Sequence, residues 1–495
     1  MNLKTNLMKN TLIMTATNLI MRTVAVSFNA YLTSKIGSAG IGLFQLIITV
    51  YSMAVTFSCA GIKLASTRVS VEIKTNGEND INKSMRMFDL YAFFCGVLIF
   101  LMLSAFSDVI SRLWVSDMRS QISLQILALS LPFVAMSASL SGYFTANNLI
   151  MQYSFIQLVE QSVKIAVAIL LLNSIKVYEI KYACAAVAAS ITVSEAVSFI
   201  FSFILKTTKT PPKTDKSAIA LRRLLRIAIP DAAGTCARSV LLTIEHLMIP
   251  KGFEKSGSGS KAALSAYGNI HAMALPVLLY PCALLTSFSA LIIPELAAKN
   301  ERKDKNGISR SVEKNLKRTL IYSSVCALII AAFAPMISNL IYKTNEAVQY
   351  IRILAPLVPI MYTDTVTDGM LKGLDQQIHS MRYNIIDSAL CVVLVWLLLP
   401  KYSVKGYIFI LYASEIINFY LSLSRLIKIC DIKIFRSFKV PSALQEDIPT
   451  FLRRTKCSSV HQAYGYREYR GRTIHSQGLQ FFRKKGRIQA LREWL

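Results

Sequence analysis

The chain has 495 residues, of which 53% are hydrophobic and 17% are charged, and its formal net charge is +27. A soluble globular domain carries about 25% charged residues, and a disordered chain would be much less apolar. Composition therefore excludes both classes and indicates an integral membrane protein.

Apolar windows of about 20 residues recur along the chain, each long enough to cross a hydrocarbon core of about 30 Å. A membrane β-barrel would show short alternating segments instead, so the sequence predicts an all-α membrane protein with about twelve transmembrane helices. The predicted spans are 8–32, 40–62, 86–107, 121–146, 151–173, 181–205, 227–250, 264–294, 318–342, 349–373, 381–399 and 405–429.

Basic residues crowd the even-numbered connections between these spans, above all the sixth, from Lys206 to Arg226, and the eighth, from Lys299 to Arg318. The positive-inside rule then places these connections and both termini in the cytoplasm, for a multi-pass protein of the cell membrane. We interpret the clusters as topology determinants and expect no nucleic-acid partner. The first span continues into Arg22 without a cleavage site, so we expect it to remain as an anchor.

An internal repeat is visible at constant offsets, and repeats of this kind are typical of transporters built from two lobes. At an offset of 216 residues, Arg22 in the first span aligns with Arg238 in the seventh. Six spans per half give both lobes the same orientation, so we predict a parallel repeat around a central cavity. At an offset of 227 the aligned pairs are Pro132 with Pro359, Gly142 with Gly369, Gln157 with Asn384 and Glu160 with Asp387.

Four segments follow from the repeat and from the changes in composition. We expect a six-helix lobe at 1–206, a basic cytoplasmic linker at 207–226, a second six-helix lobe at 227–430 and a basic tail at 431–495. The tail has no spanning run, which favours a disordered cytoplasmic segment. Two explanations of it stay open: a frameshifted or truncated terminus, and a tail that binds anionic lipid.

Positive charges inside the spans are the main candidate for a substrate site, because each costs about 2.5 to 3.5 kcal/mol on insertion scales. Arg22 and Arg238 occupy repeat-related positions, and two guanidinium groups facing one space would bind phosphate bidentately. Lys63 and Arg68 at the cytoplasmic end of the second span, and Lys164 in the fifth, would extend this cationic cradle.

Each of these charges also has a structural interpretation. Carboxylates within the membrane, such as Glu160 or Glu245, would neutralise the two repeat-related arginines, and Lys164 lies one helical turn from Glu160. The two basic residues at the end of the second span would reach the membrane surface with their long side chains.

Acidic residues gather in the second half, at Asp231, Glu245, Asp364, Asp368, Asp387 and Glu415. We single out Glu245, Asp364, Asp387 and Glu415 as candidates for coupling transport to Na⁺ or H⁺, because buried carboxylates bind cations or protons. The alternative for Asp368 is a pair with Lys372, four residues on.

No metal centre or bound cofactor is expected. The nine cysteines lack CxxC spacing, and we interpret His246 and His271 as isolated core histidines. A glycine-rich nucleotide loop does not occur in the sequence.

Several motifs carry a resemblance to a known family. They are Gly40-Ile41-Gly42-Leu43-Phe44-Gln45, the run from Gly61 to Arg68 before Glu72, Tyr267-Gly268 and Ile293-Pro294-Glu295. Over about residues 1–430 the sequence resembles the stage V sporulation protein B group of polysaccharide-lipid exporters. That group belongs to the superfamily of the multidrug and toxin extrusion transporters and the bacterial lipid II flippases.

This resemblance implies a flippase for an undecaprenyl-pyrophosphate-linked saccharide or peptidoglycan precursor. Lipid II flippases line their cavity with arginines on the first, second and eighth helices. Arg22 and Arg68 match the first two, and Arg238 would substitute for the third. Lys63 stands where the family usually has proline, and the two further helices common in the family are missing.

The sequence therefore predicts a non-enzymatic, monomeric flippase that works by alternating access, with a lipid-linked glycan and membrane lipids as its partners. A cation-coupled multidrug exporter is the alternative, which an acidic and aromatic cavity would favour. A membrane glycosyltransferase or polymerase would need a sizeable outer loop, whereas the longest one expected here, about 251–263, is short.

Overall fold

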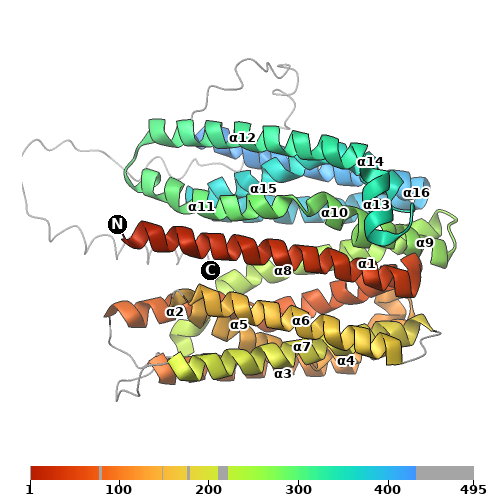
Figure 1. Ribbon diagram of the computed structural model, residues 1–495, viewed down its shortest axis with the longest axis horizontal. Coiled ribbons are helices and arrows are strands. Elements are labelled where there is room, and N and C mark those ends of the chain that lie inside the picture. The colour runs from red at the N-terminus through yellow and green to blue at the C-terminus, as the bar shows by residue number, and fades with distance from the viewer. Residues whose placement is uncertain (1, 77–80, 148, 175–178, 210–220, 431–495) are drawn as a thin grey trace, which may run out of the picture. The chain divides into compact units, whose positions relative to one another are not determined.

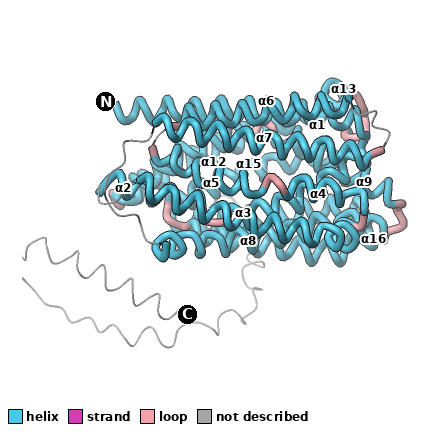
Figure 2. Tube along the Cα trace, turned by 90° about the horizontal axis from the view of Figure 1, so that it is seen from below, coloured by secondary structure: helices cyan, strands magenta, loops and turns pink. Residues whose placement is uncertain are grey.

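The computed structural model describes residues 2–76, 81–147, 149–174, 179–209 and 221–430. Helices account for most of these residues, and the described part contains no strand. The long helices lie side by side along one direction (Figures 1 and 2). The predicted all-α fold is confirmed.

The described residues form seven α-helices in the first half of the chain and nine in the second. Those of the first half are α1 (Asn2–Cys59), α2 (Ile62–Asn76), α3 (Ile81–Val109), α4 (Gln121–Ala128), α5 (Leu131–Ala146), α6 (Ile150–Ser174) and α7 (Ile180–Lys209). Those of the second are α8 (Leu221–Lys255), α9 (Ser260–Gly268), α10 (Leu275–Leu279), α11 (Cys282–Glu301), α12 (Lys305–Ala332), α13 (Ala334–Tyr342), α14 (Val348–Leu354), α15 (Val358–Gly373) and α16 (Gln377–Cys430).

Every predicted span falls on helix, although the longest elements hold two spans each. Helix α1 bends at Gly37, whose φ of 70° suits glycine, and α16 bends at Ser403. By length and composition, seven described helices are able to cross a membrane, or up to nine when each of two bent pairs is one span. The number of twelve crossings stays a prediction.

The two halves share one plan. Helices α14, α15 and α16 begin 227 residues after α4, α5 and α6 respectively. Pro132 and Pro359 both lie in the first turn of their helix. Proline is tolerated there because the N–H groups of the first turn have no acceptor within the helix. Gly142 packs on Ser66 of α2, and Gly369 packs on Ser289 of α11. In each lobe this glycine therefore packs against the equivalent helix, which is α2 in the first lobe and α11 in the second.

In both lobes the helix is interrupted just before this segment, at equivalent positions. In the first lobe α1 ends at Cys59 and α2 begins at Ile62, with Gly61 at a φ of 70° between them. In the second lobe α10 ends at Leu279 and α11 begins at Cys282, 220 residues later in each case. The break of the first lobe thus forms without the family's proline, because glycine adopts the left-handed backbone there.

The break in the second lobe leaves backbone carbonyl groups that need new donors. The N–H of Ala283 donates to Tyr280 O at 3.2 Å rather than to Leu279 O. The Leu279 carbonyl instead accepts from Nη1 of Arg22 in α1, at 2.6 Å. Tyr362 of α15 donates to Leu278 O, and Tyr322 of α12 donates to Pro281 O. Side chains from three helices therefore satisfy the backbone, as a bilayer requires.

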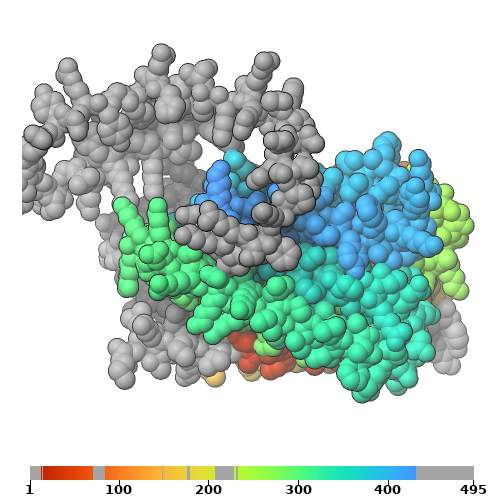
Figure 3. Space-filling view, turned by 90° about the horizontal axis from the view of Figure 1, so that it is seen from above, coloured from red at the N-terminus to blue at the C-terminus, as the bar shows by residue number. Residues whose placement is uncertain are grey.

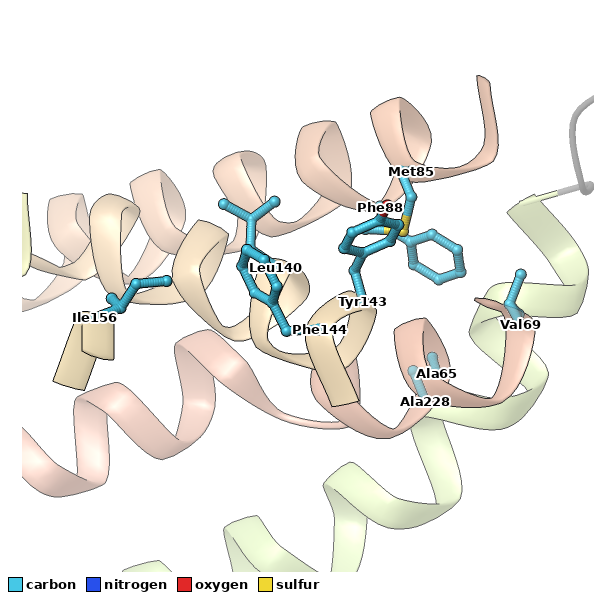
Figure 4. Close-up of a cluster of buried hydrophobic side chains, with 9 residues drawn as sticks. All are labelled: Ala65, Val69, Met85, Phe88, Leu140, Tyr143, Phe144, Ile156 and Ala228. Atoms are coloured by element: carbon cyan, nitrogen blue, oxygen red, sulfur yellow. The ribbon is translucent and has the colours of Figure 1, made fainter. Parts of the chain in front are cut away.

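The lobes contact each other at both ends of the helices. At the end that holds the N-terminus, Ala228 of α8 packs on Ala65 and Val69 of α2, in a cluster with residues of α3, α5 and α6 (Figure 4). A Cβ atom on Gly61 would lie 2.2 Å from Ala228 O, so only glycine fits this approach.

At the opposite end α1 crosses α9 through two glycines. A Cβ atom on Gly42 would lie 2.1 Å from Leu264 O, and one on Gly268 would lie 2.4 Å from Ser38 O. The hydroxyl groups of Ser38 and Ser265 are hydrogen-bonded at 2.7 Å. The resembling motifs that contain Gly42 and Gly268 therefore form a contact between the lobes.

Two details of the connections differ from the prediction. Lys206 belongs to α7 rather than to a loop, and its Nζ lies 2.6 Å from Oδ2 of the α3 residue Asp89. The expected loop 251–263 is mostly helical, because α8 extends to Lys255 and α9 begins at Ser260. The prolines of the linker and the tail 431–495 lie outside the described residues.

We predict that Tyr362→Phe destabilises the protein by about 1–3 kcal/mol, because it leaves the buried Leu278 carbonyl without its donor. Thermal unfolding of the purified protein in detergent checks this. Tyr402→Phe is the matched control, since Tyr402 is 60% exposed. Equal melting temperatures for the two variants would contradict the role of Tyr362.

Candidate functional site

The two repeat-related arginines lie at the boundary between the lobes. Arg22 comes from the first helix of one lobe and reaches the broken second helix of the other, at Leu279. Its neighbour Thr23 strengthens the contact through a hydrogen bond between Thr23 Oγ1 and the Tyr280 hydroxyl, at 2.8 Å. The structure thus places Arg22 at the contact between α1 and α10, and the cradle of two arginines stays a prediction.

Arg238 occupies the position on α8 that corresponds to Arg22 in the repeat. It is exposed and lines a cavity of about 510 Å³ together with Thr49, Ser52 and Thr56 of α1. This space, which we call the α1–α8 cavity, approaches the break of the first lobe, three residues after Thr56. Each arginine therefore comes from the first helix of its own lobe and faces the broken helix of the other.

The predicted cationic and acidic groups meet at Arg238. Its guanidinium interacts electrostatically with Asp387 and Glu415 of α16. Glu245 of α8 interacts with Asp387, and Asp364 of α15 interacts with both α16 carboxylates. The four residues proposed for ion coupling thus form one electrostatic network between α8, α15 and α16.

Hydrogen bonds hold parts of this acidic network in place. Ser414 donates to Oδ1 of Asp387 at 2.7 Å, and Asn418 donates to Oδ2 of Asp364 at 3.0 Å. Oδ1 of Asp364 and Oδ1 of Asn418 are buried and have no hydrogen-bond partner in the described part of the chain. Two oxygen atoms of neighbouring side chains therefore remain available to a proton or a hard cation.

Two further acidic residues, Asp368 and Asp231, belong to the predicted acidic set besides these four carboxylates. Asp368 accepts hydrogen bonds from Ser380 and Asn384 of α16, at 2.8 and 3.4 Å. The side chain of Asp231 lies outside the described ones. Within the described ranges, no three His, Cys, Asp or Glu side chains gather as metal ligands.

Lys164 lies inside the first lobe. It interacts electrostatically with Glu160 of its own helix and with Glu195 of α7. Ser198 also donates to Oε2 of Glu160, at 2.9 Å. This environment favours the structural interpretation of Lys164, since two carboxylates already compensate its charge.

Lys63 and Arg68 are both exposed on α2. The Lys63 ammonium lies 5.5 Å from the ring centroid of Tyr153 in α6, within the range of a cation–π contact. Helix α2, which carries both residues, lies at the end of the bundle that holds the N-terminus (Figure 1). Their position suits an anion that approaches from the membrane surface.

His246 and His271 are satisfied by hydrogen bonds, as expected of core histidines, but the expectation that they are isolated was wrong. Nδ1 of His246 lies 2.9 Å from the Tyr267 hydroxyl, and Nε2 of His271 lies 2.7 Å from the Tyr407 hydroxyl. The two imidazole rings are 4.7 Å apart. The spacing of Tyr267 and His271 by four residues was a local signal for part of this group, whereas the contacts with α8 and α16 depend on tertiary packing.

The sequence matches two known protein families. The polysaccharide biosynthesis protein family matches residues 7–288, and the MatE family matches residues 256–397. Stage V sporulation protein B of Bacillus subtilis (strain 168) is 21% identical over 409 residues, which is 81% of this chain and 79% of that protein. The resemblance expected from the motifs is confirmed.

Solved structures show the same fold. An inward-facing MATE family transporter of the MOP superfamily has a TM-score of 0.66 at 10% identity, covering 83% of this chain and 96% of that chain. The lipid II flippase MurJ in an inward closed conformation has a TM-score of 0.64 at 14% identity, covering 84% and 87%.

These neighbours confirm the two-lobe helical fold of a multi-pass membrane transporter. Since its family profile covers more than half of the sequence, the chain belongs to the polysaccharide biosynthesis protein family.

Proposed function

We propose that the protein is a flippase that moves a lipid-pyrophosphate-linked oligosaccharide or peptidoglycan precursor across the cytoplasmic membrane. The lobes would rock about their shared boundary and expose the site to each side in turn, as alternating access requires. The partners are the lipid-linked glycan and the surrounding membrane lipids. The protein acts as a monomer, without enzymatic chemistry.

One observation carries this proposal: Arg22 and Arg238 face the lobe boundary from repeat-related positions. A permanent positive charge near the middle of a spanning helix is costly. Asp387 and Glu415 offset part of this cost for Arg238, and a bound anion at the lobe boundary would compensate the rest together with the charge of Arg22. A pyrophosphate has enough oxygen atoms to accept paired N–H hydrogen bonds from both guanidinium groups, and a guanidinium stays charged at any physiological pH. Lys63 and Arg68 would receive the headgroup from the cytoplasmic surface.

The proposal predicts that Arg238→Ala slows flipping of a fluorescent lipid-pyrophosphate glycan in proteoliposomes by about 10- to 100-fold. This range corresponds to the loss of about 1.5–3 kcal/mol for a hydrogen bond to a charged group. Arg22→Ala should have a similar effect, and Lys at either position should restore activity only in part, because lysine lacks the fork.

Arg112→Ala is the matched control, because Arg112 has a side chain that is 64% exposed and pairs with Asp108 one turn away. Arg22 also donates a hydrogen bond to the Leu279 carbonyl, so its loss could lower stability. The melting temperature of each variant is therefore measured together with its flipping rate. Wild-type flipping in folded Arg22→Ala and Arg238→Ala proteins would reject the site.

We further propose that Glu245, Asp364, Asp387 and Glu415 couple transport to an Na⁺ or H⁺ gradient. The two partnerless oxygens of Asp364 and Asn418 support this role. Asp364→Asn should make flipping insensitive to an imposed ion gradient while the rate without a gradient stays near that of the wild type. Glu254→Gln, an exposed change, is the control. Unaltered gradient dependence in Asp364→Asn would exclude the role.

A cation-coupled multidrug exporter is the second candidate. The MatE match at residues 256–397 and the acidic network of the second lobe favour it. Transport of organic cations that depends on Asp387, together with no flipping of pyrophosphate lipids, would select this candidate over the flippase.

The proposed direction of transport rests on cytoplasmic termini. A cysteine at Ser258, between α8 and α9, should be labelled by impermeant maleimide added from outside, whereas a cysteine at Lys303, between α11 and α12, should be labelled only after the membrane is permeabilised. The labelling is done in intact and in permeabilised cells with a cysteine-free background. The reverse pattern would overturn the orientation.

A further inference from the structure

A second cavity, of about 680 Å³, lies between α1 and the helices α10, α12 and α13. We call it the α1–α13 cavity. Thr23, Ser27, Tyr31 and Ser34 line it from one face of α1, at helical spacings of three and four residues. Its volume is within the range of about 300–1,000 Å³ that small-molecule sites occupy.

The length of this cavity matches one leaflet of a bilayer. At 1.5 Å per residue, the stretch of α1 from Thr23 to Ser34 spans about 16 Å. This is about half of a hydrocarbon core of about 30 Å. The opposite wall contains apolar side chains, among them Ile330 of α12 and Ile337 of α13. The cavity therefore suits a single hydrocarbon chain that enters from one membrane surface.

The two ends of the cavity differ in chemistry. At the end that holds Thr23, the lining hydroxyl groups of Thr23 and Tyr280 are hydrogen-bonded to each other at 2.8 Å. The surface end carries Lys343, the one charged residue in the described lining, exposed after the last turn of α13. Lys35 lies nearby, with its ammonium 5.8 Å from the ring centroid of Tyr31. Within the described lining, the positive charge therefore lies at the end of the cavity that holds Lys343.

The cavity also has a route to the surrounding lipid. Leu340, in its wall, is 74% exposed. Side chains of α1, in red, reach the surface beside the green side chains of the second lobe (Figure 3). The buried hydroxyl of Tyr31 has no hydrogen-bond partner among the described residues. An amphipathic ligand would enter sideways and offer its polar groups to Tyr31 and the lysines.

We propose that the α1–α13 cavity binds an anionic glycerophospholipid of the bilayer, with one acyl chain between α1 and α13 and the phosphate at Lys343. The α1 face carries hydroxyl groups, while the isoleucine and leucine side chains of α12 and α13 opposite them suit an acyl chain better than a saccharide. The cavity ends after one leaflet, which matches an ordinary acyl chain better than a long polyprenyl chain. The inference does not depend on the proposed transport activity.

Native mass spectrometry of the purified full chain with added phosphatidylglycerol or phosphatidylcholine tests this. Lys343→Gln should weaken retention of phosphatidylglycerol about fivefold, the change expected for about 1 kcal/mol per basic residue near a membrane surface, and leave phosphatidylcholine unchanged. Ile337→Trp fills the cavity and should weaken both lipids. Lys261→Gln, an exposed lysine of α9 outside the lining, should change neither.

A lipid with a photoreactive group in its acyl chain supplies an independent readout. Crosslinks should concentrate on α1 between Thr23 and Ser34 and on α13. Ser27→Phe serves as a second filling variant if Ile337→Trp lowers the melting temperature. Uniform crosslinking that includes the exposed Leu98 and Leu101 of α3 would overturn the proposal. Binding of undecaprenyl phosphate at Lys343 without phosphatidylglycerol would also overturn it.

Discussion

The need to satisfy backbone carbonyl groups inside a bilayer governs this structure. Each lobe breaks its second helix, and water cannot compensate the freed groups at that depth. In the second lobe, tyrosines of α12 and α15 and Arg22 from the other lobe donate to them. Arg22 is the only member of this set that crosses the boundary, so its interaction ties the break of one lobe to the position of the other. Under the proposed function, a phosphate that drew Arg22 away would release this tie and would give the substrate a direct means of influencing lobe motion.

The repeat makes the two sides of the boundary similar in plan and different in chemistry. Arg22 meets a carbonyl group of α10, whereas Arg238 borders a cavity and interacts with Asp387 and Glu415. In the first lobe the corresponding carboxylates, Glu160 and Glu195, interact with Lys164 of the same lobe. Charge compensation is thus internal to the first lobe, while in the second it involves an arginine at the boundary. This asymmetry favours the second lobe as the one in which ion binding and substrate binding influence each other.

Much of the fold could be predicted from the sequence, because span length and the spacing of Pro132 and Pro359 are local properties. The helix break at Gly61 was less visible, since a lysine stands at the family's proline position and the positive φ of the glycine depends on close packing against Ala228. The hydrogen-bond partners of Arg22, His246 and His271 come from other helices or from the far side of a loop, so no local pattern indicated these bonds, although the spacing of Tyr267 and His271 indicated one ring contact. The pair of Lys164 and Glu160 was visible as a helical spacing, and it gave the structural alternative that the structure favours.

The central claim, that Arg22 and Arg238 together bind a lipid pyrophosphate, is tested most directly by the lipids that remain bound during purification. Mass spectrometry of lipid extracts should detect a pyrophosphate-linked glycan lipid with the wild-type protein. The lipid should be lost from a folded variant that combines Arg22→Gln and Arg238→Gln. Equal amounts of this lipid in both preparations, or its absence from the wild type grown with an intact supply of such lipids, would contradict the account.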